Sequence, residues 1–373
     1  MTHSNLDLSE LTHTIGRLFM AGMPGPTLDH NTKSLIRDQG LGGIILFSRN
    51  IEGPVQLAAL CRDLQQAAIK AHGIPLFMAV DQEGGRVVRL REPFTQFPGN
   101  TAIGTAENPV EAAINFAEVT AQEMVLVGLN MDMAPVMDVR RGAPEKHLMD
   151  RTFSDDPQTV ALLGRHVVNT LQKNHIMAVA KHFPGLGRTT MDPHHHLPTI
   201  DADEAEMERI HLPPFQAAIA AGVSSVMSSH ALYPSIDPGT PATLSSRVIN
   251  GILRQRLGFD GLVITDDLEM GAIREGWGVV KGAVSAFKAG CDILLICEDQ
   301  PAVLQSMNAL KAGILREEIP VQQLHTAITR INKTKGRFLK SAREISLHKV
   351  RDYFEHKSQA PGRQPFMNKI LTD

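Results

Sequence analysis

Short apolar runs alternate with longer stretches of helical periodicity along the chain. The runs cover residues 43–47, 75–81, 131–139, 179–183, 224–230, 261–267 and 292–297, and an eighth is expected near residues 17–22. They are continuous rather than alternating with polar residues, which predicts strands that are buried on both faces, as in a parallel sheet.

Helices are expected between these runs. One opens at Asn108–Pro109 and another at Asp156–Pro157, because each pair places a capping side chain before a proline at the first helical position. A third is expected over residues 205–221. About eight strand–helix units in this order predict an α/β fold of the (β/α)8 TIM-barrel type. The competing fold, a doubly wound open sheet, would carry a GxGxxG turn after its first strand, and we find none there.

The chain length fits one barrel with additions. The 373 residues, 43% of them hydrophobic, suggest two domains at about 150 residues each, yet α/β barrels run to about 250 residues or more as one domain. Residues 341–373 are polar and carry no clear strand. We therefore expect a single-domain barrel over residues 1–340 and a C-terminal extension over residues 341–373 that wraps the barrel.

Charge and cysteine content narrow the class of protein. Lys and Arg number 37 against 40 Asp and Glu, a net charge of −3, whereas a nucleic-acid binder usually carries a basic excess. The three cysteines are dispersed, which argues against a disulfide framework or a zinc pattern and suits a reducing cytoplasm. No signal-peptide pattern and no apolar stretch of about 18 residues is present. We expect a cytoplasmic protein without a nucleic-acid or membrane partner.

Charged residues follow the apolar runs, at the strand ends where a barrel carries its chemistry. They are Asp81, Asp138, Lys181, His182, His230, Asp266 and Asp267. Each one alone could be a solvated loop charge or a helix cap. Together they favour a site, because charges that are buried without partners are costly.

The segment 181–198 is the richest in candidate chemistry. Asp192 lies two residues before His194, and Pro193 between them favours an extended backbone that points both side chains the same way. The carboxylate could then orient the imidazole and raise its basicity. Two other interpretations stay open: a metal site, although adjacent histidines rarely all bind one ion, and a polar loop without chemistry.

Asp266 ends an Ile/Val-rich run, where a carboxylate is placed for nucleophilic or electrostatic work. Asp267 follows it directly. Adjacent side chains diverge, so only one of the two is expected to face the centre, and alternation does not decide which.

The segment 81–90 is a candidate for binding hydroxyl groups. Its charged residues surround two glycines, which permit tight backbone turns; they are Asp81, Glu83, Arg86 and Arg89. A salt-bridged surface turn is the alternative. Arg151, just before a helix cap, is a further candidate, or else part of a structural ion pair.

Nine motifs along the chain carry a family resemblance. They are LFSRN (46–50), DQEGGRVVR (81–89), DMAPVMDV (132–139), DRTFSDDP (150–157), KHFPGLG (181–187), DPH (192–194), VMSSHALYP (226–234), PATLS (241–245) and LVITDDLEMGAI (262–273). In these motifs and their order the chain resembles glycoside hydrolase family 3. More narrowly, it resembles the single-barrel bacterial β-N-acetylglucosaminidases of cell-wall recycling.

The resemblance implies retaining, two-step hydrolysis of terminal N-acetylglucosamine. Asp266 matches the family's nucleophile, and His194 with Asp192 matches an acid/base histidine, whose pKa near 6.5 suits it to donate and then accept a proton. The positions that match sugar-binding residues are Asp81, Arg89, Arg151, Lys181 and His182. The implied substrate is a small soluble saccharide, N-acetylglucosamine linked to anhydro-N-acetylmuramic acid. We expect no metal and no cofactor.

The loop after residue 181 departs from the family pattern. Leu186 and Arg188 stand where the family usually has His and Asp, and Pro193 replaces a serine. Two alternatives to this hydrolase therefore stay open: a glycosidase or phosphorylase of other specificity, and a non-catalytic sugar-binding barrel.

Aromatic residues make up only 5% of the chain, with one Trp and two Tyr. Long polysaccharide grooves need rows of aromatic stacking platforms. The shortage argues against such a groove and fits a small polar pocket for one terminal sugar.

Overall fold

A parallel β-barrel forms the centre of the computed structural model, which describes residues 8–142, 148–189, 191–339 and 344–359. The barrel strands are β1 (Phe19–Ala21), β2 (Gly43–Leu46), β3 (Phe77–Val80), β6 (Met131–Asp132), β7 (Met177–Phe183), β8 (Ser225–Ser228), β11 (Leu262–Thr265) and β12 (Leu294–Ile296). All their residues are buried, as continuous apolar runs require in a sheet covered on both faces.

The strand order is β11-β8-β7-β6-β3-β2-β1-β12, with parallel pairing throughout. A parallel bridge between Ile264 and Ile293 joins the two ends of this sheet. The predicted (β/α)8 barrel is thereby confirmed. Its strand ends converge on one face, where the candidate residues lie.

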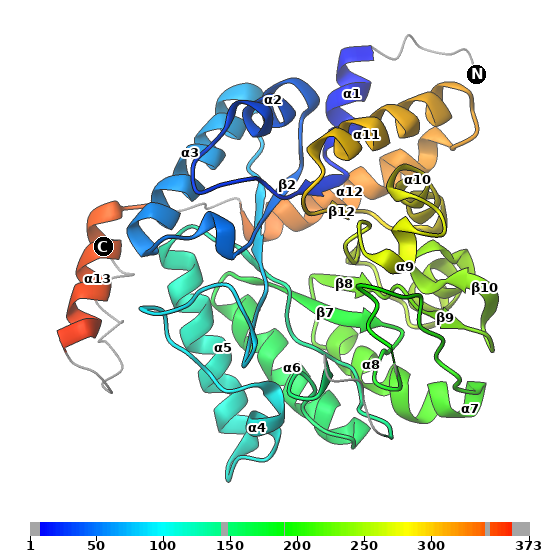
Figure 1. The fold of residues 1–373 in the computed structure, drawn as a ribbon, viewed down its shortest axis with the longest axis horizontal. Coiled ribbons are helices and arrows are strands. Elements are labelled where there is room, and N and C mark those ends of the chain that lie inside the picture. The colour runs from blue at the N-terminus through cyan, green and yellow to red at the C-terminus, as the bar shows by residue number, and fades with distance from the viewer. Residues whose placement is uncertain (1–7, 143–147, 190, 340–343, 360–373) are drawn as a thin grey trace.

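Helices surround the barrel (Figure 1). They are α1 (Leu8–Gly16), α2 (His30–Gln39), α3 (Pro54–His72), α4 (Asn100–Gly104), α5 (Pro109–Leu126), α6 (Pro157–Lys173), α7 (Glu204–Glu206), α8 (Leu212–Ala220), α9 (Gly271–Arg274), α10 (Val279–Ala289), α11 (Gln300–Leu315), α12 (Val321–Phe338) and α13 (Leu347–Gln359). Asp156 caps α6 as predicted, since its side chain accepts from two backbone N–H groups. Asn108 precedes α5 without a capping bond from its side chain.

Two predicted elements differ in the structure. The run 131–139 forms a strand only over β6, because Pro135 has no N–H to donate to the ladder; pairing resumes at a bridge between Val136 and Lys181. The helix expected over residues 205–221 is divided into α7, a π-helical turn η3 (Met207–His211) and α8. The prolines that follow His211 supply no N–H, so the regular hydrogen-bond pattern cannot run through.

Helix α13 lies within the predicted C-terminal extension, beside α3 (Figure 1). The Phe354 ring packs edge-on against Phe94 at 4.8 Å, and Lys357 donates to the buried Glu123 carboxylate of α5 at 2.5 Å. The domain boundary at residue 340 stays a prediction, and residues 360–373 lie outside the described part. Within the described residues, no helix is long and apolar enough to cross a bilayer.

Candidate active site

The hairpin after β3 brings two acidic residues beside Lys181 of β7. Its strands are β4 (Gln82–Gly84) and β5 (Val87–Val88), and the turn between them uses Gly84 and Gly85 at φ of 86° and 61°, a region that favours glycine. Lys181 Nζ donates to Asp81 Oδ1 at 2.9 Å and to Glu83 Oε1 at 2.6 Å. Arg89 Nη2 reaches Asp81 Oδ2 at 3.1 Å.

Arg151 enters the same cluster from the loop before α6. Its guanidinium grips Glu83 with two bonds, Nε to Oε2 at 2.8 Å and Nη2 to Oε1 at 2.9 Å. Nη2 also lies 3.3 Å from His182 Nε2. The structure thus brings all five predicted sugar-binding residues together, and Glu83 joins them. The sequence analysis named Glu83 among the charges of the segment 81–90, a candidate for binding hydroxyl groups, but not among the matched sugar-binding positions.

The ion pairs keep the cluster charged although it is buried. Burial alone would raise the pKa of Asp81, but Lys181 and Arg89 outweigh it and lower that pKa. The pKa of Glu83 is lowered in the same way by Arg151 and Lys181. The Asp81 and Arg89 side chains are 16% and 25% exposed, against 1% for Glu83. Asp81 and Arg89 therefore form the open edge of the cluster, where hydroxyl groups of a ligand can be bound.

Asp138 fixes the orientation of His182. Its Oδ2 lies 2.7 Å from His182 Nδ1, and its Oδ1 accepts the N–H of Leu186 at 2.7 Å. Burial alone would raise the pKa of Asp138, but the His182 ring and the N–H groups of Leu186 and His182 lower it, so the carboxylate is ionised. An ionised acceptor at Nδ1 requires Nδ1–H, so Nδ1 donates in this contact. In the sequence, Asp138 was indicated by its place near the end of the run 131–139 and by the motif DMAPVMDV.

The pKa values of Asp266 and Asp267 are shifted in opposite directions. Burial alone would raise the pKa of Asp266, but His182 and His230 lower it, and the N–H of Asp267 donates to its Oδ1 at 2.8 Å. Burial raises the pKa of Asp267 to about 7, and its Oδ1 accepts the N–H of Glu269. This contrast makes Asp266 the more readily ionised of the two carboxyl groups. Alternation in the sequence left open which of them faces the centre. Its catalytic role stays a prediction.

His230 is a further site residue whose role the sequence did not indicate. Its ring is fully buried, with Nδ1 2.8 Å from Thr243 Oγ1 and Nε2 2.9 Å from the Asp267 carbonyl. Burial lowers its pKa, so the ring is neutral and Nε2–H donates to that carbonyl. His230 therefore holds the backbone next to Asp266.

Asp192 and His194 form the expected pair. His194 Nδ1 lies 2.7 Å from Asp192 Oδ1, and the imidazole is 61% exposed. The predicted extended backbone is wrong, because the N–H groups of His195 and His196 both bond to the Asp192 carbonyl in a turn. The Asp192 carboxylate also accepts the His194 N–H at 2.9 Å, and such Asx bonding favours a turn.

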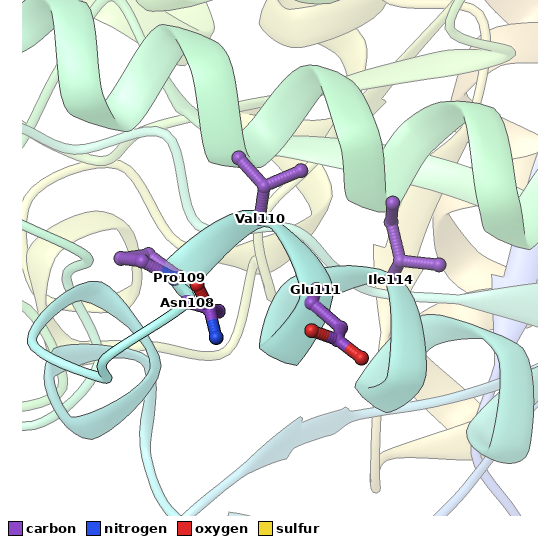
Figure 2. Close-up of a pocket in the computed structure, with 5 residues that line it drawn as sticks. All are labelled: Asn108, Pro109, Val110, Glu111 and Ile114. Carbon is purple, nitrogen blue, oxygen red and sulfur yellow. The ribbon is translucent and has the colours of Figure 1, made fainter.

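Other parts of the described chain show no competing centre. Among the described residues, no group of three or more His, Cys, Asp or Glu side chains could hold a metal ion. A shallow surface depression of about 420 Å³ lies at the start of α5, and none of the predicted site residues lines it. Val110 and Ile114 point to one side of the helix there and Glu111 to the other (Figure 2).

Comparison with known proteins decides the family. The model of the glycosyl hydrolase family 3 N-terminal domain matches residues 10–334. The chain belongs to glycoside hydrolase family 3. A β-hexosaminidase from Thiobacillus denitrificans is 38% identical over 289 residues, which cover 76% of this chain and 79% of that protein. One from Nitrosomonas eutropha is 33% identical over 338 residues, which cover 88% and 95%.

Solved structures of family 3 enzymes have the same fold. A β-N-acetylglucosaminidase from Paenibacillus sp. matches with a TM-score of 0.88 and 38% identity, over 90% of this chain and 64% of that one. A β-N-acetylhexosaminidase from Beutenbergia cavernae matches with a TM-score of 0.82 and 31% identity, over 87% and 98%. This chain thus spans just under two thirds of the Paenibacillus protein. The predicted family, the barrel and the class of glycoside hydrolases are confirmed.

Two residues that depart from the family 3 loop pattern, Leu186 and Arg188, make specific contacts in the structure. The Leu186 side chain is buried, and the backbone N–H of Leu186 donates to the Asp138 carboxylate. Arg188 Nη1 donates to both carboxylate oxygens of Glu206, at 2.8 and 2.7 Å. Glu206 also lies 3.5 Å from Nε2 of the buried His211. The start of this loop is therefore tied to the end of α7 in this family 3 hydrolase.

Proposed function

We propose that this protein is a retaining exo-β-N-acetylglucosaminidase that removes terminal N-acetylglucosamine from peptidoglycan-derived muropeptides. The observation that carries the proposal is the 2.7 Å contact between His194 and Asp192. The backbone of this loop is hydrogen-bonded to Gly271, on the segment that also contains the ionised Asp266. The names of the relatives, β-hexosaminidase and β-N-acetylglucosaminidase, support the same sugar.

The proposed reaction has two steps. First, an Asp266 carboxylate oxygen bonds to the anomeric carbon as the glycosidic C–O bond breaks, and Nε2–H of the His194 imidazolium gives its proton to the leaving oxygen. Then Nε2 takes a proton from water, whose oxygen attacks the anomeric carbon and displaces Asp266. Asp192 accepts Nδ1–H throughout and stabilises the imidazolium.

The paired cluster supplies the sugar pocket in this proposal. Asp81 and Arg89 at its open edge bind hydroxyl groups of the terminal sugar, while Glu83 holds Lys181 and Arg151 in place behind them. Such a grip needs no aromatic platform, which agrees with the low aromatic content and with a short, soluble substrate. The three cysteines are free and buried, which supports action in a reducing cytoplasm.

The nucleophile is tested with 4-nitrophenyl N-acetyl-β-D-glucosaminide. Wild-type protein is expected to release nitrophenol with retention at the anomeric carbon. Retention is measured by NMR, which identifies the anomer that forms first. Asp266→Ala should lower kcat by about 10³-fold or more. Asp63→Ala, at an exposed carboxylate of α3, is the control and should leave kcat unchanged. Activity that survives Asp266→Ala would remove this residue as the nucleophile.

Substrate and acceptor are tested together. N-acetylglucosaminyl-anhydro-N-acetylmuramic acid should be cleaved in preference to a panel of other β-glycosides. A phosphorylase is the second candidate, because a histidine repels an incoming phosphate less than a carboxylate would. If phosphate makes the sugar 1-phosphate the main product, hydrolysis is not the natural reaction. Tight sugar binding in calorimetry without turnover would favour a non-catalytic barrel.

A further inference from the structure

The loop that carries Asp192 and His194 rests on the start of α9. The N–H of Gly271 donates to the His194 carbonyl at 3.0 Å, and the N–H of Ala272 donates to the Pro193 carbonyl at 3.3 Å. The first N–H groups of a helix have no partner within it. The loop thus satisfies two such donors, and the contact depends on how closely the two backbones approach.

Position 271 has no room for a side chain. A Cβ atom there would lie 2.9 Å from the carbonyl oxygens of His194 and His195, and 3.0 Å from the His195 carbonyl carbon. These are backbone atoms, so no rotamer change can relieve the contact. The φ of Gly271 is not in the left-handed region. The glycine is therefore required by the approach of the loop and not by its own conformation.

The start of α9, which the loop contacts, follows Asp266 closely along the chain. Between them, a turn is closed by the bond from the Met270 N–H to the Asp267 carbonyl at 3.0 Å. The Asp267 carbonyl also accepts from His230 Nε2 at 2.9 Å. In addition, the Glu269 carboxylate accepts the N–H groups of Glu298 and Asp299 after β12. Asp266 and Gly271 therefore lie on one braced segment.

We propose that Gly271 is a positioning residue that seats the acid/base loop on the segment carrying the nucleophile. This inference rests on the proposed function. The absence of a Cβ lets the carbonyls of His194 and His195 close onto α9, and the braced turn relates His194 to Asp266.

The test compares Gly271→Ala with Gly276→Ala. A Cβ at Gly276 would meet no atom within 4 Å, so the control adds the same methyl group in open space. Displacing the acid/base loop should lower kcat/KM by about 10- to 100-fold for an alkyl N-acetylglucosaminide, which needs a proton for its leaving group. For the 2,4-dinitrophenyl glycoside, which needs none, kcat/KM should fall by less than about threefold. Azide should raise kcat of Gly271→Ala on the dinitrophenyl substrate, because it attacks the glycosyl-enzyme without a general base.

Equal losses on the two substrates, or activities like those of Gly276→Ala, would overturn the proposal. His194→Ala separates this result from the proposed function. If His194→Ala lacks the leaving-group pattern, the acid/base assignment fails; if it shows the pattern while Gly271→Ala does not, only the positioning role fails.

Hydrogen exchange in the wild-type protein keeps the proposal testable if Gly271→Ala does not fold. The amides of Gly271 and Ala272 should exchange slowly, because the loop carbonyls are the acceptors of these helix-terminal N–H groups. Exchange as fast as in an unstructured peptide would show that the loop is not seated and would overturn the proposal.

Discussion

Glu83 binds two buried cations of the active-site cluster at once, and its replacement tests how far that cluster stabilises the barrel. The carboxylate accepts Arg151 Nε and Nη2 at 2.8 and 2.9 Å and Lys181 Nζ at 2.6 Å. Glu83→Gln keeps the size of the side chain but places an NH2 group where one acceptor oxygen was. That NH2 group would face only hydrogen-bond donors, and both Arg151 and Lys181 would lose their negatively charged partner Glu83.

The expected cost follows from the burial of the pair. Removing one partner of a buried ion pair costs about 3–5 kcal/mol. Because the Glu83 side chain is 1% exposed and that of Arg151 is 11% exposed, water cannot replace the lost contacts. With an unfolding entropy of about 2.1 cal/mol/K per residue, this loss lowers the Tm of a 373-residue chain by about 4–6 °C.

The loss should also depend on pH. Burial alone would raise the pKa of Glu83, but Arg151 and Lys181 outweigh it and lower the pKa below its ordinary value of 4.5. A carboxylate with a depressed folded pKa contributes stability that is present above the unfolded pKa and is lost as pH falls toward the folded pKa. Wild-type stability should therefore fall below about pH 4.5, and Glu83→Gln should fall less steeply.

Urea denaturation at pH 7 and over an acidic series measures both effects. Glu111→Gln, the same change at an exposed position of α5, is the matched control. If Glu83→Gln unfolds within about 0.5 kcal/mol of this control at pH 7, the cluster is not the buried ion-pair network that the distances describe.

Two further predictions concern charges outside this cluster. Lys335 is buried among backbone carbonyls, and burial lowers its pKa to about 7. Above that pH the folded chain binds fewer protons than the unfolded one, so stability should rise toward pH 10.5 by up to about 1.4 kcal/mol per pH unit. Lys335→Met should abolish this rise in denaturation curves, and an unchanged slope would contradict the assignment. Arg188 is 42% exposed in its pair with Glu206, so a double-mutant cycle of Arg188→Gln and Glu206→Gln should give a coupling free energy of about 0.2–1 kcal/mol. A coupling indistinguishable from zero at low salt would show that this pair does not hold the loop.

The barrel strands could be predicted because a strand buried on both faces leaves an uninterrupted apolar run. The prediction failed where backbone hydrogen bonding overrides hydrophobicity. Pro135 ends the regular pairing of β6 within such a run, and Pro213 with Pro214 interrupts an otherwise amphipathic helix. A prediction based on hydrophobicity alone does not account for the N–H group that each proline lacks.

The site was predictable as a set of residues but not as a set of partners. Charges at strand ends indicated where the charged cluster lies, since the parallel strands of a barrel all end at one face. Glu83 and Arg151 are 68 residues apart, and nothing local to either residue shows that they pair. The distinction between Asp266 and Asp267 likewise depends on His182, on β7, and on His230, just after β8.

The contacts of α13 affect where the protein can be truncated at its C-terminal side. The family match ends at residue 334, so a truncation drawn on homology would discard this helix. It would uncover the Phe94 ring and leave the Glu123 carboxylate buried without its Lys357 counterion. Because Glu123 also accepts the N–H of Thr95, the damage would reach the chain segment that follows Arg89. A chain cut at the end of the family match is therefore expected to be less stable than one that keeps α13.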